Sequence, residues 1–169
     1  MSHWLLRLLK HRRLDETDAK RLLGAGAMQR IEARVAASET RHSGEIRVCV
    51  EAGLPLSYVR RAAPVRERAV MMFGKLRVWD TEHNNGVLIY LLLADHAIEI
   101  VADRGVARHA DAAWWQGLTA TMGAAFKAGQ FEAGLNQAID AVDALLAQHF
   151  ALAPGEANPN ELPDAPYVR

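Results

Sequence analysis

Apolar side chains recur along the chain at two kinds of interval, and each interval predicts a type of element. Spacing of three and four residues predicts helices, whereas alternation or a short unbroken apolar run predicts strands. Gly24 and Gly26 weaken the first helix, which we expect to break there. The pattern predicts helices over 15–41, 64–76, 111–128 and 131–150, and strands over 45–51, 86–93 and 97–102.

The order of these elements predicts an α/β fold: a three-layer α/β/α sandwich with a short mixed central sheet flanked by helices. The strand over 86–93 has an unbroken apolar character, so we expect it to be buried on both faces and central. The first two strands are joined through a helix and should be parallel, whereas the third should return antiparallel. A chain of 169 residues, 50% of them hydrophobic, suffices for one such domain.

Two end segments differ in composition from the domain expected over 15–150. Residues 1–14 form a basic amphipathic N-terminal segment. Its stretch Trp4–Arg13 either packs on the domain as a short helix or makes a peripheral contact with an anionic membrane. Residues 151–169 hold four of the 6 prolines and predict a flexible tail, either loose or laid extended over the surface.

Charge and cysteine content exclude several classes of protein. Lys and Arg number 20 and so do Asp and Glu, so the chain lacks the basic excess of a nucleic-acid-binding protein. A single cysteine, Cys49, cannot form an internal disulfide and is expected to be buried as a small hydrophobic residue. The N-terminal charges stand in the wrong order for a secretory signal, and no apolar run has the length of a membrane span. We therefore expect a cytoplasmic protein.

Standard catalytic signatures are missing, including dinucleotide and phosphate loops, the nucleophile elbow and the zinc-binding HExxH motif. We expect no organic cofactor. Oxygen-bearing side chains instead gather near the ends of the predicted strands, and carboxylate, amide and hydroxyl oxygens from several loops suit Ca²⁺ or Mg²⁺. The alternative is that they are ordinary turn residues. The candidate metal ligands are Glu45, Asp80, Thr81, Asn85 and Asp103.

Four segments together resemble the TPM domain family: Ser43–Val48, Thr81–Tyr90, Asp103–Gly105 and Phe126–Leu135, in this order. The resemblance covers roughly residues 15–150. It implies an α/β/α sandwich, a divalent-cation site at the loop ends and, for plant members, an acid phosphatase activity. It also implies a bacterial branch without a signal peptide, with a LemA-type membrane protein as partner.

The chain departs from the family pattern at one position of the candidate site. It reads Asn84-Asn85-Gly86 where many members read Asp-Asn-Gly. Because Ca²⁺ affinity depends on the number of charged ligands, the missing carboxylate should weaken the site.

Two functions are compatible with these observations. The first is a non-catalytic accessory or interaction module with a weak Ca²⁺ or Mg²⁺ site, associated with a protein partner and with the inner face of the bacterial membrane. The alternative is a metal-dependent, acid phosphatase-like phosphomonoesterase, in which Asp103 or Glu45 is base or ligand and Arg104 neutralises the phosphate. No nucleophile or acid pair is evident, which favours the module. Binding of a small metabolite at the same edge is a third alternative.

Overall fold

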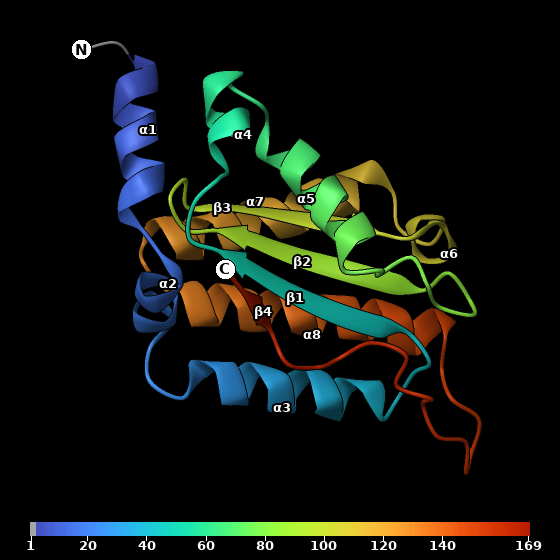
Figure 1. Ribbon diagram of the computed structural model, residues 1–169. Helices are drawn as coiled ribbons and strands as arrows, with labels where there is room; N and C mark the ends of the chain where they lie inside the picture. Colours follow the sequence, from blue (N-terminus) through green and yellow to red (C-terminus); the bar gives the residue numbers. More distant parts are fainter. Residues whose placement is uncertain (1–2) are drawn as a thin grey trace.

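The computed structural model describes residues 3–169 as a sheet between layers of helices (Figure 1). The four strands lie in the order β3-β2-β1-β4. This confirms the predicted α/β fold with a mixed central sheet. The elements are α1 (His3–Arg13), α2 (Glu16–Leu23), α3 (Ala27–Glu39), β1 (Glu45–Glu51), α4 (Leu56–Arg60), α5 (Val65–Lys75), β2 (Gly86–Leu92), β3 (Ala97–Ala102), α6 (Arg104–Ala107), α7 (Ala112–Lys127), α8 (Phe131–His149) and β4 (Tyr167–Val168).

Strand pairing follows the predicted directions. β1 and β2 are parallel, and β3 returns antiparallel to β2. All seven residues of β2 are buried, as its unbroken apolar run predicts for an interior strand. The first predicted helix is divided into α2 and α3 at Gly24 and Gly26, whose φ angles of 96° and 71° are left-handed.

The sheet separates two hydrophobic cores. Helices α2, α3, α7 and α8 cover one face, against Ile46, Val48 and Val50 of β1. Helices α4 and α5 cover the other face, which includes Cys49. Figure 1 shows α5 and α8 on opposite sides of the sheet. Each core therefore uses alternate residues of the same strands.

The second face of β1 is buried although it is polar. The alternation predicts the strand but not what covers its polar face, and every residue of β1 is buried. Helices α4 and α5 and the C-terminal segment cover this face, so Glu45, Arg47 and Glu51 must find partners inside the protein. Arg47, for example, donates to the backbone carbonyls of Pro163 and Ala165.

The proline-rich C-terminal segment lies extended against the free edge of β1. Its last residues form β4, which pairs parallel with β1 at Cys49 and Val50. The amide of Arg169 donates to the Val50 carbonyl at 2.9 Å, and the amide of Ala52 donates to the Arg169 carbonyl at 2.7 Å. Leu162 is buried in the second core. The end of the C-terminal segment therefore covers the free edge of β1.

Helix α1 is attached to the domain through Asp95. The Asp95 carboxylate lies 3.1 Å from the Arg7 guanidinium and 3.2 Å from the ring of buried His11. Hydrogen bonding to His11 and pairing with Arg7 lower the pKa of Asp95 to about 2. The side chain of Trp4 lies outside the described residues. No helix within residues 3–169 is long and apolar enough to cross a membrane.

Candidate functional site

Three turns that are remote in sequence meet at one end of the sheet. The Glu45 amide donates to the Asn85 carbonyl at 3.3 Å, and the Asp103 amide donates to the Gly86 carbonyl at 2.9 Å. The Gly105 amide donates to the Asn84 carbonyl, also at 2.9 Å. We call residues 43–45, 81–86 and 103–105 the rim. The starts of β1 and β2 and the end of β3 therefore form one continuous surface.

Two glycines allow the turns of the rim to approach each other. A Cβ atom on Gly86 would lie 2.0 Å from the Val78 carbonyl oxygen, and one on Gly105 would lie 2.4 Å from that of Asn84. Neither distance is compatible with a side chain. Asn84 itself has a left-handed backbone with φ of 52°, a conformation that asparagine tolerates better than most residues. The rim depends on these residue types for its shape.

Asn85 links two of the turns from a fully buried position. Its Nδ2 donates to the Ser43 carbonyl at 3.0 Å and to the Ser43 hydroxyl at 3.3 Å. Its backbone amide donates to Thr81 Oγ1 at 3.0 Å. Asn85 Oδ1 is buried and has no hydrogen-bond partner among residues 3–169. The rim therefore contains one unsatisfied amide oxygen.

Asp103 contributes a second unsatisfied oxygen. Its Oδ1 accepts from the Arg104 amide at 2.7 Å and begins α6, but its Oδ2 is buried without a hydrogen-bond donor in the described chain. The exposed Arg104 side chain donates from Nε to Asn84 Oδ1 at 3.0 Å. Asp103 and Arg104 therefore lie beside the asparagine turn.

The other two predicted carboxylates are engaged elsewhere. Both oxygens of Glu45 accept backbone hydrogen bonds, from Glu161 at 3.1 Å and Leu162 at 3.0 Å. Burial raises the pKa of Glu45. Asp80 is exposed and pairs with Arg77. In the described residues no three His, Cys, Asp or Glu side chains form a cluster that could hold a metal ion.

A polar cavity that the sequence analysis missed opens at the rim. We call it the rim pocket; its volume is about 410 Å³. The His109 ring stacks on that of His149 with centroids 4.0 Å apart, and burial lowers the pKa of His109. Because these side chains come from separate turns and helices, no local motif indicates the pocket. Its polar lining includes Ser43, His83, Arg108, His109 and Glu156.

No catalytic nucleophile is assembled beside this pocket. The Ser43 hydroxyl contacts the Phe150 carbonyl at 3.5 Å and the Asn85 amide group, not His42. His42 is buried, with Nδ1 3.0 Å from the Gly44 carbonyl, and burial lowers its pKa to about 4. Cys49 is also buried, which raises the pKa of its thiol. These groups therefore do not form a nucleophile–base pair.

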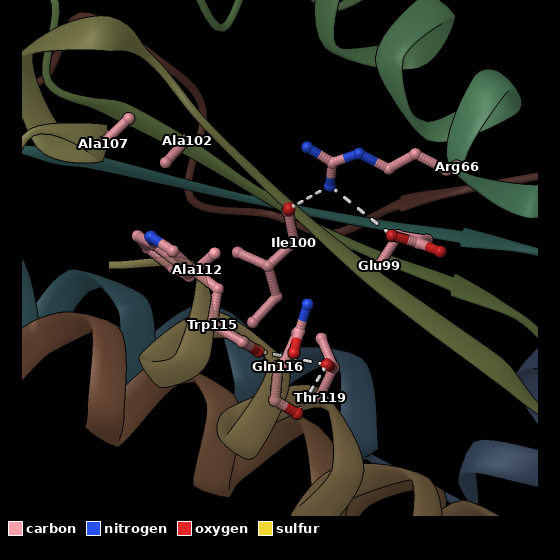
Figure 2. Close-up of a pocket in the computed structure, with 9 residues that line it drawn as sticks. All are labelled: Arg66, Glu99, Ile100, Ala102, Ala107, Ala112, Trp115, Gln116 and Thr119. Carbon is pink, nitrogen blue, oxygen red and sulfur yellow. Dashed lines mark hydrogen bonds and ion pairs between the residues drawn. The ribbon is translucent and has the colours of Figure 1, made fainter. Parts of the chain in front are cut away.

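A second groove lies between α5, β3 and α7, away from the candidate ligands (Figure 2). Its volume is about 390 Å³. Arg66 reaches across it to the Ile100 carbonyl and to Glu99, while Trp115 and Thr119 of α7 line the opposite wall. None of the predicted site residues lines this groove.

Comparisons with known proteins place the chain in a family. The TPM domain model matches residues 17–145. The NMR structure of BA42 protein from the psychrophilic bacterium Bizionia argentinensis is similar, with a TM-score of 0.75 and 27% identity, covering 90% of this chain and 99% of that chain. An NMR structure of the N-terminal domain of a protein from P. gingivalis shares the fold at 18% identity, with a TM-score of 0.62, covering 84% of this chain and 96% of that one. No curated protein matches significantly. Because the family match covers most of the chain, as the four sequence segments predict, this protein belongs to the TPM domain family.

Proposed function

We propose that this protein is a non-catalytic accessory module whose rim binds Ca²⁺ or Mg²⁺ weakly. The observation that carries the proposal is the pair of buried oxygens, Asp103 Oδ2 and Asn85 Oδ1, that have no donor among residues 3–169. A buried carboxylate oxygen without a donor is costly, and a bound cation would offset that cost. Backbone hydrogen bonds from Asp103 to Gly86 and from Gly105 to Asn84 hold the two turns together, so both oxygens belong to one rim.

The ligand set of the rim accounts for the weak affinity. Asp103 is its carboxylate, and Asn85 and the Thr81 hydroxyl are neutral. Glu45 and Asp80, which would add charge, bind the C-terminal segment and Arg77 instead. Since Ca²⁺ affinity rises with the number of charged ligands, we expect a dissociation constant on the order of a millimolar.

The accessory role rests on the chemistry that surrounds the rim. Ser43 and His42 are not hydrogen bonded to each other, and Cys49 is buried as a thiol. We therefore propose that the protein acts through a protein partner, for which the family resemblance suggests a LemA-type membrane protein. The cation would order the rim turns in this role.

A cation titration of the full chain tests the rim. In ¹H–¹⁵N spectra, Ca²⁺ or Mg²⁺ should shift the amides of Asn85, Gly86 and Asp103 and reach saturation near ~10 mM. Asp103→Asn should weaken this response at least tenfold because it removes the charged ligand. Asp80→Asn is the matched control and should titrate like the wild type. Amides of the rim that do not move in the wild type would contradict the proposal.

The rim pocket favours a second candidate, a metal-dependent phosphomonoesterase. Imidazole and guanidinium groups of His83, His109 and Arg108 line the pocket beside Gly105, and charge-assisted hydrogen bonds from such groups bind phosphate. A cation held by Asp103 would polarise the ester and activate water, with Arg104 nearby as a further positive group.

Phosphate release from a chromogenic monoester, measured with Mg²⁺ and Ca²⁺, separates the two candidates. The accessory role predicts release that is equally low in the wild type, Asp103→Asn and Arg108→Ala. If the protein is a phosphatase, the rate of phosphate release should be at least tenfold lower in both variants than in the wild type. This result would contradict the accessory role. Release that is high but equal in all three proteins would identify a contaminating enzyme.

A further inference from the structure

Basic residues gather at the end of the sheet opposite the rim. Helices α1 and α4 stand side by side there, beyond the carboxyl ends of β1 and β2, whereas the rim lies at the starts of these strands (Figure 1). Residues 3–13 and 53–63 contain no Asp or Glu, although the whole chain has 20 acidic and 20 basic residues. The positive charge of this end is therefore a local excess. The basic residues of the two segments are Arg7, Lys10, Arg12, Arg13, Arg60 and Arg61.

Only part of this charge is paired with carboxylates. Arg7 pairs with Asp95, and Arg61 pairs with Glu67. Lys10 lies 3.9 Å from the Asp95 carboxylate, and its side chain is 52% exposed. The other arginines of the two helices are exposed and make no ion pair within residues 3–169; they are Arg12, Arg13 and Arg60.

The acidic residues that follow α1 are engaged within α2. Asp15 and Asp18 form its capping box, in which each side chain accepts from the backbone amide of the other. Glu16 pairs with Lys20 at 2.6 Å. These carboxylates therefore form no ion pairs with the exposed cations of α1.

Two exposed leucines lie among the free charges. Leu9 of α1 is 48% exposed, and Leu56 of α4 is 44% exposed. Apolar side chains interspersed with Lys and Arg are typical of a surface that rests on an anionic membrane, because the cations bind headgroups while the apolar side chains enter the acyl boundary. A surface that binds nucleic acid through phosphate contacts requires the cations but not the leucines.

The domain holds α1 and the segment that leads to α4 in fixed positions. The buried His11 ring accepts from the Leu54 amide at 3.0 Å and lies 3.2 Å from Asp95. A Cβ atom on Gly53 would lie 2.3 Å from the His11 carbonyl oxygen, so the two backbones are in direct contact. Because the surface is formed before binding, docking does not require the ordering of a segment.

We propose that the exposed surface of residues 7–13 and 56–61, which we call the basic end, binds the headgroup surface of an anionic lipid bilayer. Arg12, Arg13 and Arg60 bind lipid phosphates, and Leu9 and Leu56 enter the boundary with the acyl chains. The rim lies at the other end of the sheet, so a bilayer bound here leaves it facing the solution. This proposal does not depend on cation binding at the rim.

Flotation of the full chain with lipid vesicles tests the basic end. Vesicles of equal parts phosphatidylglycerol and phosphatidylcholine should carry the wild type upward in a density gradient at low salt, whereas pure phosphatidylcholine vesicles should not. Each Lys or Arg near an anionic surface contributes about fivefold to binding. The triple variant Arg12→Gln, Arg13→Gln, Arg60→Gln should therefore bind about a hundredfold more weakly.

A matched control removes the same charge from another part of the surface. The variant Arg30→Gln, Arg34→Gln, Lys127→Gln alters exposed residues of α3 and α7 and should float like the wild type. Circular dichroism should show that both triple variants are folded. The proposal is overturned if the wild type does not float with anionic vesicles, or if the two triple variants float equally, since total charge would then decide binding.

The leucines distinguish a bilayer from other polyanions. Leu9→Gln combined with Leu56→Gln should weaken flotation about tenfold, because two partly exposed leucines no longer enter the acyl boundary. Doxyl-labelled lipid in bicelles of the same composition should broaden the amides of Leu9 and Leu56 and leave those of Asn85 and Asp103 sharp. Unchanged flotation of the leucine variant, or broadening confined to the rim, would overturn the bilayer as the partner of the basic end.

Discussion

Replacing Arg68 with Met should lower the free energy of unfolding by about 3–5 kcal/mol, the cost expected when one partner of a buried ion pair is removed. Arg68 on α5 and Glu51 on β1 are 3% and 1% exposed. Arg68 Nε donates to Glu51 Oε2 at 2.7 Å, and the Tyr90 hydroxyl donates to the same oxygen, also at 2.7 Å. Met retains much of the volume of Arg, so the loss reports the uncompensated carboxylate rather than a cavity.

A double variant separates charge from packing. Glu51→Gln combined with Arg68→Met removes both charges, and replacing a buried pair is often neutral. We therefore expect the double variant to recover at least half of the stability that Arg68→Met loses. Tyr90→Phe, which removes one hydrogen bond to the carboxylate, should cost about 1.5–3 kcal/mol.

Urea unfolding followed by circular dichroism measures these differences. A loss below about 1 kcal/mol in Arg68→Met, or a double variant no more stable than the single one, would show that Glu51 is not held as a buried charge.

The ion pair illustrates what the hydrophobic pattern can and cannot predict. The pattern predicts strands over 45–51 and 97–102 with the bounds that the structure has, because each segment has a period of two or a clear turn at its ends. The same alternation does not show what covers the face of the strand that carries Glu51. The packing of α5 and the C-terminal segment over this face depends on residues far away in the sequence.

Short elements are the ones that the pattern misses. Helices α4 and α6 have five and four residues, too few to show a helical period. Strand β4 has two residues at the end of a proline-rich segment. Its pairing is determined by the backbone of β1, which no local signal in the segment reveals.

The contacts in the candidate sites likewise include some that the order of elements predicts and some that it does not. The proximity of Asn85 and Asp103 follows from a strand that returns antiparallel, so sequence order is enough to predict it. The engagement of Glu45 by the Glu161 and Leu162 amides is not predictable, because it requires the path of the C-terminal segment. The pairing of Glu39 with Asp164 depends on the same path.

Glu39→Gln should remove most of the loss of stability that the wild type shows in alkaline, metal-free buffer. Burial and the neighbouring Glu45 and Asp164 raise the pKa of Glu39 from 4.5 to about 9. The folded state therefore keeps a proton that the unfolded chain releases. The stability linked to this proton is complete below pH ~4.5 and is lost as the pH rises through about 9.

The stability linked to His42 has the opposite pH dependence, so the contributions of His42 and Glu39 can be measured in different pH ranges. Burial lowers the pKa of His42 from 6.5 to about 4, so its contribution is lost as the pH falls from 6.5 to 4. Above pH 6.5 the pH dependence due to Glu39 remains. In this range it lowers the free energy of unfolding by at most about 1.4 kcal/mol per pH unit. We expect wild-type stability to fall by about 2 kcal/mol from pH 7 to pH 9.

Gln reproduces the protonated form of Glu39, since its carbonyl oxygen can accept from the Ile46 amide while its amide group donates to Asp164. Urea unfolding at pH 7 and pH 9 with a chelator present should therefore give nearly equal stabilities for Glu39→Gln. Below pH 6.5, where His42 contributes, the stability of Glu39→Gln should fall with decreasing pH as much as that of the wild type does. An alkaline loss of the same size in both proteins would place the titrating group elsewhere, and Glu39 would then be ionised inside the protein despite its burial.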